Sequence, residues 1–513
     1  MTPSLHIRLD ISRTTYQSPH VVTDTTAPPV TPEKSSTNWL LIIAVLGGMF
    51  LAMLDQTIVG TALPRITAEL GGGGLYTWVV TAYLLTSTVT VPLYGRLSDT
   101  YGRKPLLLTG IAIFLLGSAL CGLAQDMVQL ILFRGLQGLG AGALLPLSLA
   151  LMMDTFTGKA GAKVQGAVGG VMGLSYLAGP YLGGVLTDHA DWRWVFYVNL
   201  PIGLVLVPIM VFTLPRTAVA ARRGRPDYLG IAIFSAAVTA LLLGLTEKGL
   251  AAEDGRPHAW TSLPVAGPIA GAAALLALFV LVERRAAEPI VPLHLFRNRT
   301  YTVVNVVSFF MAFGMYAGVV FLPRYFQEAR GLTASESGLR IYPLMLAMLA
   351  GSAVTGVLMS RTGRYKPALV AAPLLLIAGT VLCAGLALDT GDAAMIAWMA
   401  LIGLGIGPTM SGLTVAVQTA VPPRYIGTAS ANLTFFRQVG GSVALAVAGT
   451  AYSTTVAGHA PAHGLPAAHA EAAATVIPWL GVAGGLVALA AIVLLPGGRI
   501  RIPEVDQGQG AIA

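Results

Sequence analysis

The stretch GRLSDTYGRKP at residues 95–105 lies between two apolar runs, residues 75–95 and 105–124. Each run has the length of about 20 residues that a helix needs to cross the hydrocarbon core of a bilayer. Runs of this kind recur along the whole chain, whereas the strands of a membrane barrel would alternate over roughly 10 residues. The pattern therefore predicts membrane-spanning helices joined by short polar turns.

The composition agrees with this prediction. The chain has 513 residues, of which 55% are hydrophobic and only 11% charged, while about a quarter of the residues in ordinary globular proteins are charged. So much apolar surface has to face lipid, so we expect an all-α polytopic membrane protein in contact with membrane lipid. The net charge of +8 is explained by basic loops at the cytoplasmic face, and we expect no nucleic-acid partner.

Fourteen spans are predicted, which places both ends of the chain on one side. The spans are at residues 39–62, 75–95, 105–124, 127–153, 164–187, 194–214, 229–247, 261–282, 300–323, 334–359, 367–388, 393–417, 426–452 and 475–496. Most of the 31 Lys and Arg residues fall on the side of the N-terminus; those in loops on the other side are Arg65, Arg193, Lys248, Arg256, Arg324 and Arg330. The positive-inside rule therefore predicts cytoplasmic termini and an inner, cytoplasmic membrane location.

An internal repeat divides the chain. The turn at 95–105 resembles GVLMSRTGRYKP at 356–367, and each follows the second helix of a six-helix set if the seventh and eighth spans form a linker. Such repeats are common in transporters, with the substrate site between the two halves. The predicted parts are a disordered cytoplasmic tail (1–38), an N-terminal six-helix bundle (39–214), a linker with two extra spans (215–299), a C-terminal six-helix bundle (300–496) and a second cytoplasmic tail (497–513).

The order of residues in the turn 95–105 resembles the signature loop of the major facilitator superfamily. Four further segments resemble its fourteen-span drug:proton antiporter branch: LDQTIVGTALP (54–64), RGLQGLG (134–140), GLSYLAGPYLGG (173–184) and WRWVFYVNLPIG (192–203). The chain departs from the family at Gly60, where Asn is usual. The resemblance implies a transporter of two six-helix bundles and two additional helices that works by alternating access.

Asp55 and Arg134 are the principal candidate residues for proton coupling. An ionisable residue inside a span is costly and indicates function. Asp55 is 16 residues into the first span, about 24 Å along a helix of about 36 Å, and Arg134 is 7 residues into the fourth span from the opposite side, about 10 Å deep. We therefore expect them in the same layer, and the resemblance implies that Arg134 couples proton transfer to Asp55. The alternative is an acid satisfied by a neighbouring helix for packing alone.

Five further residues are candidates for gating. The resemblance implies that Asp154 joins Asp99 and Arg103 in a charge network at the cytoplasmic gate; the alternative is a helix-end acid beside a basic turn. Gly179 and Pro180 belong to a motif that is associated with exchanging exporters in the family. Pro kinks a helix and Gly permits close packing, although ordinary small-residue packing would use the same residues.

The remaining candidates for a substrate or proton path are Gln137, Glu328 and Arg437. Glu328 is predicted at the outer mouth, where a solvated residue is favoured over a proton site, and Arg437 lies about 17 Å into the thirteenth span. His459, His463 and His469 are expected in the last outer loop without a bound metal. No cofactor is expected, and no nucleophile–base arrangement indicates an enzyme.

The functional hypothesis is a proton-coupled antiporter that exports lipophilic drugs, dyes or antibiotics. The expected ligands are protons and small lipophilic molecules, including cations that Asp55 would attract, and the expected oligomeric state is a monomer. A dedicated exporter of one endogenous metabolite or lipid is the first alternative. A non-transporting membrane sensor or scaffold is a more remote one.

Overall fold

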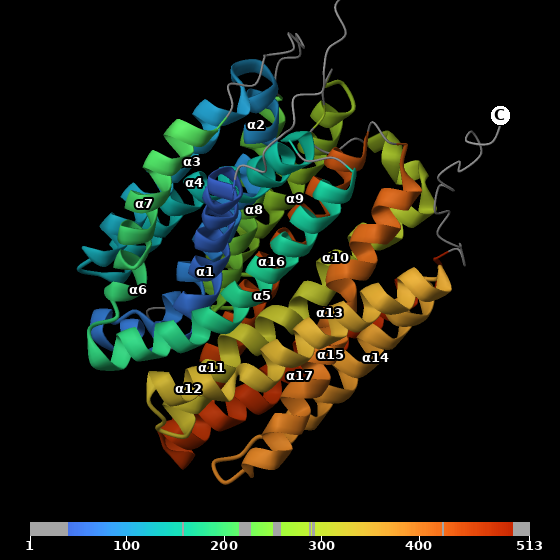
Figure 1. Ribbon diagram of the computed structural model, residues 1–513. Coiled ribbons are helices and arrows are strands. Elements are labelled where there is room, and N and C mark those ends of the chain that lie inside the picture. Colours follow the sequence, from blue (N-terminus) through green and yellow to red (C-terminus); the bar gives the residue numbers. More distant parts are fainter. Residues whose placement is uncertain are drawn as a thin grey trace, which may run out of the picture. The chain divides into compact units, whose positions relative to one another are not determined.

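The computed structural model describes residues 39–155, 158–214, 227–249, 258–286, 289, 293–422 and 425–495. The predicted tails, 1–38 and 497–513, therefore lie outside the described residues. Almost all of the described chain is helical, and its helices run back and forth in the manner that the apolar runs predict (Figure 1).

The first group of helices extends to residue 213. Its members are α1 (Trp39–Leu70), η1 (Gly73–Leu75), α2 (Trp78–Tyr101), α3 (Arg103–Gly122), α4 (Met127–Thr155), α5 (Gly158–His189), α6 (Trp194–Tyr197) and α7 (Asn199–Thr213). Within this group α1 packs on α4, α5 and α7, while α4 also packs on α2 and α3. We refer to α1–α7 as the first half.

The second half comprises the helices after residue 298. They are α10 (Arg299–Tyr316), η3 (Ala317–Phe321), α11 (Leu322–Arg324), η4 (Tyr325–Ala329), α12 (Ala334–Arg340), α13 (Tyr342–Thr362), α14 (Lys366–Leu382), η5 (Cys383–Gly385), α15 (Asp392–Ala420), α16 (Ile426–His463) and α17 (Leu465–Val493). Here η3 and η4 are π-helical turns, and α10 packs on α15, α16 and α17.

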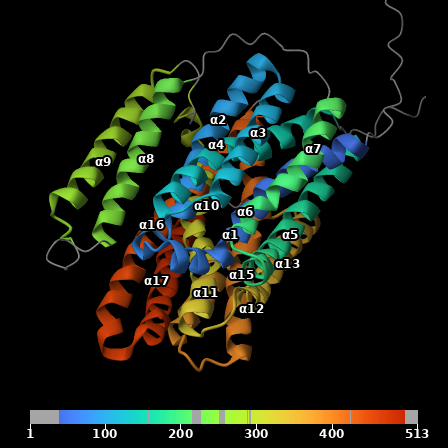
Figure 2. The ribbon, with the colours of Figure 1, turned by 90° about the vertical axis from the view of Figure 1, so that its left-hand side faces the viewer.

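A helix pair lies between the two halves in the sequence, formed by α8 (Tyr228–Gly249) and α9 (Leu263–Glu283), followed by η2 (Leu293–Arg297). Figure 2 shows the pair at one side of the helix bundle, where α8 contacts α2 and α16. The Phe234 ring lies 5.3 Å from the Phe279 ring and 4.9 Å from the Phe435 ring, measured between centroids. This aromatic cluster anchors the pair to α16 in the second half.

Thirteen helices or runs of helices among the described residues are long and apolar enough to cross a membrane. All fourteen predicted spans coincide with helices; the one absent from the thirteen is α5, whose 32 residues are long enough but rich in Gly. Glycine contributes little to the mean hydropathy, which explains why this helix is long enough to cross a membrane but less hydrophobic than the others. The fold class predicted from the sequence is confirmed.

The sequence predicts an outer loop between the last two spans, and this prediction is wrong. Instead, α16 continues to His463 and α17 begins at Leu465, so that His469 lies in a helix. Gly464 separates the two helices with φ of 81°, a backbone region that favours glycine. The ninth span is also longer than predicted, because helical turns continue to Ala329 and include Arg324.

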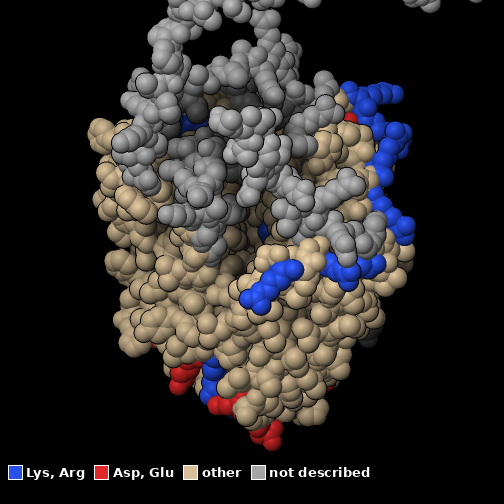
Figure 3. All heavy atoms as spheres, turned by 45° about the vertical axis from the view of Figure 1, so that its right-hand side comes forward, with Lys and Arg blue, Asp and Glu red and all other residues tan. Residues whose placement is uncertain are grey.

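We call the end of the bundle that carries residues 71–77, 190–193 and 330–333 the distal end, and the opposite end the proximal end. Exposed acids at the distal end include Asp126, Asp188, Glu336 and Asp389, and exposed cations at the proximal end include Arg297, Arg299, Arg361 and Arg364. Figure 3 shows a broad band of uncharged side chains between the two ends of one face. The positive-inside rule predicts that the proximal end is the cytoplasmic one.

Several contacts between the two halves lie in their distal parts, and one, from the Thr88 hydroxyl to Oε1 of Gln438 (2.6 Å), lies nearer the middle of α2 and α16. The Gln327 amide donates to the Thr61 carbonyl (2.8 Å) and the Tyr76 hydroxyl donates to the Val320 carbonyl (3.4 Å). The Asp188 carboxylate at the end of α5 accepts hydrogen bonds from the first backbone amides of α12, those of Ala334 (3.1 Å) and Ser335 (2.6 Å). These bonds satisfy amide groups that have no partner within the helix.

Candidate functional site

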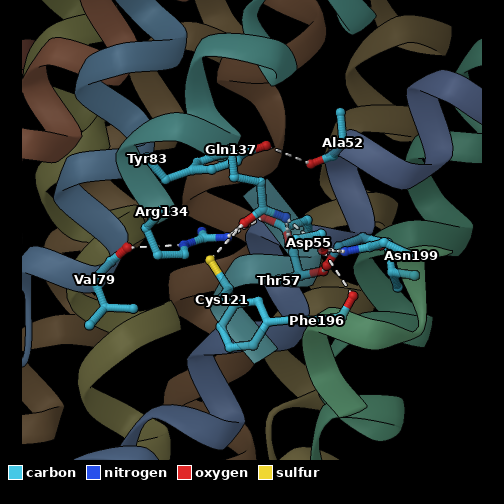
Figure 4. Close-up of polar contacts among 12 residues, drawn as sticks. Ala52, Asp55, Thr57, Val79, Tyr83, Cys121, Arg134, Gln137, Phe196 and Asn199 are labelled. Carbon is cyan, nitrogen blue, oxygen red and sulfur yellow. Dashed lines mark hydrogen bonds and ion pairs between the residues drawn. The ribbon is translucent and has the colours of Figure 1, made fainter. Parts of the chain in front are cut away.

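Asp55 lies in the interior of α1, and its side chain has no exposure to solvent. Its Oδ2 atom is 2.6 Å from Nη1 of Arg134 in α4, whose side chain is 1% exposed. The two residues thus form a buried ion pair in the layer that the depth argument predicts (Figure 4). Such a pair is held in a membrane span only when the charges compensate one another.

Two amide side chains complete the coordination of Asp55. The other carboxylate oxygen, Oδ1, accepts hydrogen bonds from Gln137 (2.7 Å) in α4 and Asn199 (3.3 Å) at the start of α7. Both amides also donate to the Ser118 hydroxyl in α3, at 3.1 and 2.9 Å. The carboxylate is therefore connected through hydrogen bonds to α3, α4 and α7, and a change in its charge would alter contacts with all three helices.

The position of Arg134 is set by more than its ion pair. Its Nε donates to the Val79 carbonyl at 3.1 Å, and its Nη1 donates to Oε1 of Gln137 at 2.7 Å. The guanidinium carbon lies 4.2 Å from the centroid of the Tyr83 ring in α2, a geometry in which a cation is attracted to the ring face. Arg134 therefore has partners besides Asp55 and would keep them if the carboxylate were protonated.

Close approach of the backbones brings these side chains together. A Cβ atom on Gly117 would lie 2.5 Å from the Cα atom of Gln137, and one on Gly138 would lie 2.5 Å from the Tyr83 carbonyl oxygen. Real Cβ atoms do not approach other atoms so closely. Glycine at these two positions lets α3 and α2 press against α4, as small residues do at helix interfaces in membranes.

Gly179 and Pro180 lie where α5 crosses between the two halves. Gly179 faces Thr57 of α1, whose hydroxyl donates to the Ser175 carbonyl of α5 at 3.2 Å. On the other side of α5, a Cβ on Gly184 would lie 2.5 Å from the Ala334 carbonyl oxygen of α12. Pro180 is inside the helix and its carbonyl faces Gly338. The motif thus packs against α1 in one half and α12 in the other.

The predicted cytoplasmic network is only partly described. Asp99 lies in the last turn of α2 and Asp154 in the last turn of α4, but both side chains are outside the described residues. Arg103 begins α3, and its neighbour Lys104 donates to the carbonyls of Val211 and Leu214 at 2.6 and 2.9 Å. The three network residues belong to helix ends on the proximal side, as predicted, and their pairing stays a prediction.

The structure places Glu328 differently from the favoured prediction of a solvated residue. Its side chain is 20% exposed, and Oε2 is 2.7 Å from Nε of Arg324 and 2.8 Å from Nδ1 of His469. The sequence suggested a loop because the apolar run ends near residue 323, whereas the π-helical turn η4 carries Glu328 back toward α17.

Arg437 lines a small pocket inside the second half. The cavity has a volume of about 10 Å³, room for one water molecule. Its lining includes Met311, Met315 and Met410, flexible side chains that suit apolar guests of varied shape. The described residues thus place Arg437 beside this small, methionine-lined cavity, and its role in a substrate path stays a prediction.

Sequence reasoning missed Ser118 and Asn199 as partners of Asp55, and Arg324 and His469 as partners of Glu328. Asn199 lies in the quoted segment 192–203, but only its contact with Asp55 reveals a role. A buried polar residue must find a hydrogen-bond partner, so a search for Asn and Ser within apolar runs could have found two of the four.

Comparisons with known proteins agree with the geometry. The sequence pattern of the Major Facilitator Superfamily matches residues 45–445. Multidrug transporter protein MdtP of Bacillus subtilis (strain 168) is 40% identical over 419 residues, covering 81% of this chain and 75% of that protein. Multidrug resistance protein 3 of the same organism is 32% identical over 420 residues, covering 82% and 80%.

Among solved structures, a bacterial homologue of the human lysosomal transporter Spinster, in an inward-facing and unoccupied conformation, has a TM-score of 0.61 at 14% identity. The alignment covers 90% of this chain and 97% of that one, and at this identity it shows the fold alone. The sequence match, the relatives and the helical architecture together show that this chain belongs to the Major Facilitator Superfamily and is a multi-pass membrane transporter rather than an enzyme.

Proposed function

We propose that this transporter is a proton-coupled antiporter that exports lipophilic small molecules from the cytoplasm. The observation that carries the proposal is the Asp55–Arg134 ion pair, which is enclosed in the first half at 0% and 1% exposure. A carboxylate at that depth is costly and is the natural place for a transported proton to bind. The names of two relatives as multidrug proteins support the substrate class.

Proton binding changes the charge of the network without dismantling it. A proton on Oδ2 of Asp55 neutralises the carboxylate and removes its attraction for Arg134. The hydrogen bonds from Gln137 and Asn199 reach the other oxygen, Oδ1, and can persist. The cation is then held by the Val79 carbonyl, Gln137 and the Tyr83 ring. Protonation therefore removes the partner of Arg134 on α1 and leaves its partners on α2 and α4.

The contacts between the halves support an assignment of this conformation. Those that join Thr61 to Gln327, Tyr76 to Val320, and Asp188 to the start of α12 lie in the distal part of the bundle. The Thr88–Gln438 hydrogen bond lies nearer the middle. Because the positive-inside rule makes the distal end extracellular, this conformation is closed toward the outside. Alternating access then requires these contacts to break while a proximal gate forms, for which Asp99, Arg103 and Asp154 are the proposed residues.

The Gly179–Pro180 motif is the proposed pivot of that movement. It packs against Thr57 of α1 and the backbone of α12, so α5 touches both halves at the place where they must separate. Pro180 removes one backbone hydrogen bond within the helix, which weakens its resistance to bending. Bending at Pro180 would let α5 move relative to α1 and α12 and so open the distal end.

Substrate is proposed to bind between the halves near the midplane. In the closed distal conformation Asp55 is fully enclosed and Arg437 lines the methionine-rich pocket. Attraction of cationic substrates by Asp55 therefore requires release of the carboxylate from Arg134. Competition of proton and substrate for that carboxylate would itself produce exchange.

The proposal is tested with the purified protein in liposomes that contain a pH-sensitive dye. An imposed proton gradient should drain when a lipophilic substrate is added, and Asp55→Asn should abolish this substrate-dependent proton flux. Asp389→Asn, at an exposed acid of the distal end, is the matched control and should behave as wild type. Unchanged flux in Asp55→Asn would refute the role of Asp55.

A panel of compounds distinguishes the remaining alternatives. Proton flux with many unrelated lipophilic compounds supports a multidrug exporter. Flux with a single compound would identify a dedicated exporter of one metabolite or lipid. No flux with any compound, in protein that retains its wild-type melting behaviour, would favour the sensor or scaffold and contradict the proposal.

A further inference from the structure

A second cluster of ionisable side chains lies at the distal end, separate from the Asp55 network. Oε2 of Glu328 accepts a hydrogen bond from Nε of Arg324 at 2.7 Å and lies 2.8 Å from Nδ1 of His469. The side chains of Arg324, His469 and Glu328 are 8%, 13% and 20% exposed. Arg324 and His469 thus converge on one carboxylate oxygen of Glu328, in a cluster that water reaches only in part.

The cluster combines distant parts of the chain. Arg324 comes from α11, Glu328 from η4 and His469 from α17. The Tyr452 hydroxyl of α16 lies 3.1 Å from Nδ1 of His469 and 3.3 Å from its carbonyl oxygen. Among the described residues of this cluster, Glu328 and Tyr452 contact His469, and Arg324 binds the same carboxylate oxygen; Glu328 is the acid.

Arg324 connects the cluster to the first half. Its guanidinium carbon lies 4.2 Å from the centroid of the Tyr452 ring and 4.2 Å from that of the Tyr76 ring, so the cation is sandwiched between the two rings. Tyr76 precedes α2, and its hydroxyl donates to the Val320 carbonyl across the interface. When the distal end opens, Tyr76 must leave Arg324, and water then gains access to the cluster.

Histidine is the one member of this cluster whose ordinary pKa lies between pH 5 and 8. Arg324 stays charged at all relevant pH values, and the two tyrosines ordinarily ionise only near pH 10. A separation of 2.8 Å between Nδ1 and Oε2 indicates a shared hydrogen. A further proton from water would bind the other ring nitrogen and convert the imidazole to an imidazolium beside the Glu328 carboxylate.

We propose that His469 and Glu328 form a second proton-binding site, which loads from the distal side and is coupled to distal closure through Arg324 and Tyr76. The inference rests on the proposed function as a proton-coupled transporter and adds a binding step to it. Asp55 then holds the proton within the first half, while His469 senses the external pH at the gate. The two sites are distinguishable because different variants remove them.

The transport test uses the full chain in liposomes, with the pH at the distal side varied from 5 to 8 and the proximal pH fixed. His469→Gln keeps a hydrogen-bonding amide but cannot titrate, and we expect the transport rate to lose one ionisation in this range. His459→Gln, at an exposed histidine of α16, is the matched control and should retain the wild-type pH profile. A wild-type profile in His469→Gln overturns the proposal.

A second measurement does not depend on transport. Histidine-selective NMR of the purified protein resolves at most eight side chains, and the signal absent from His469→Gln should shift as the pH is lowered. Glu328→Gln should change that response, because an imidazolium would lose its carboxylate partner. A His469 signal that does not respond to pH, or a response unaffected by Glu328→Gln, overturns the proposal even if Asp55 proves to be the coupling residue.

Discussion

Replacement of Arg134 by Gln should reveal the energetic cost of leaving Asp55 without its cation. Arg134 is 1% exposed and Asp55 is 0% exposed, so water cannot replace the guanidinium without rearrangement. The variant removes the 2.6 Å ion pair, the hydrogen bond to the Val79 carbonyl and the contact with the Tyr83 ring. Removal of one partner of a buried pair typically costs about 3–5 kcal/mol, and we expect Arg134→Gln to lose stability in that range.

The double variant Asp55→Asn/Arg134→Gln separates the effect of charge from the loss of packing. It places two neutral amides where the two charges were, and no uncompensated charge remains. We expect it to recover about 0.5–3 kcal/mol of the loss in unfolding free energy, the coupling typical of residues in direct contact. Thermal unfolding in detergent, followed by tryptophan fluorescence, should rank wild type first, the double variant second and Arg134→Gln last. A double variant no more stable than Arg134→Gln would refute the reasoning.

Two further perturbations test the packing and the distal contacts. Gly183→Leu should lower the free energy of unfolding by about 1–3 kcal/mol through overpacking, because its side chain would meet the Ile58 carbonyl of α1. Gly170→Leu is the control: a Cβ there meets nothing within 4 Å, and its free energy of unfolding should stay within about 0.5 kcal/mol of wild type. Equal melting temperatures for the two variants would contradict the close packing. Asp188→Ala removes the acceptor of two α12 amides and should open the distal end more often. A cysteine introduced between the halves should then react faster with a membrane-impermeant thiol reagent added from outside. An unchanged labelling rate would show that this contact does not hold the distal end closed.

Apolar runs and helix geometry predict much of this fold. A span must be long and apolar whatever it packs against, so helices occur at all fourteen predicted positions. The approach of Asp55 and Arg134 was predictable because a helix rises about 1.5 Å per residue. The position of each residue in its span therefore gives its depth, and the two depths agree. Depth cannot reveal which faces meet, and for that reason Asn199 and Ser118 were not identified as partners of the carboxylate.

The distal cluster escaped prediction for a different reason. Hydropathy marks the part of a helix that lies in lipid, but α16 and the run that ends at Ala329 continue beyond it. Glu328 and His469 were consequently assigned to loops, where charged residues are solvated. Their contact depends on the π-helical turn η4 and on packing against α17, neither of which has a signature in the local sequence.

The central claim, that Asp55 couples substrate movement to protons, is tested most directly by comparing two kinds of transport in the same liposomes. One experiment measures uphill substrate accumulation driven by a proton gradient, and the other measures exchange of labelled for unlabelled substrate with no gradient. The account predicts that Asp55→Asn loses uphill accumulation and retains exchange, because a neutral side chain permits alternating access without proton release. Proton-driven accumulation at the wild-type level in Asp55→Asn would contradict it.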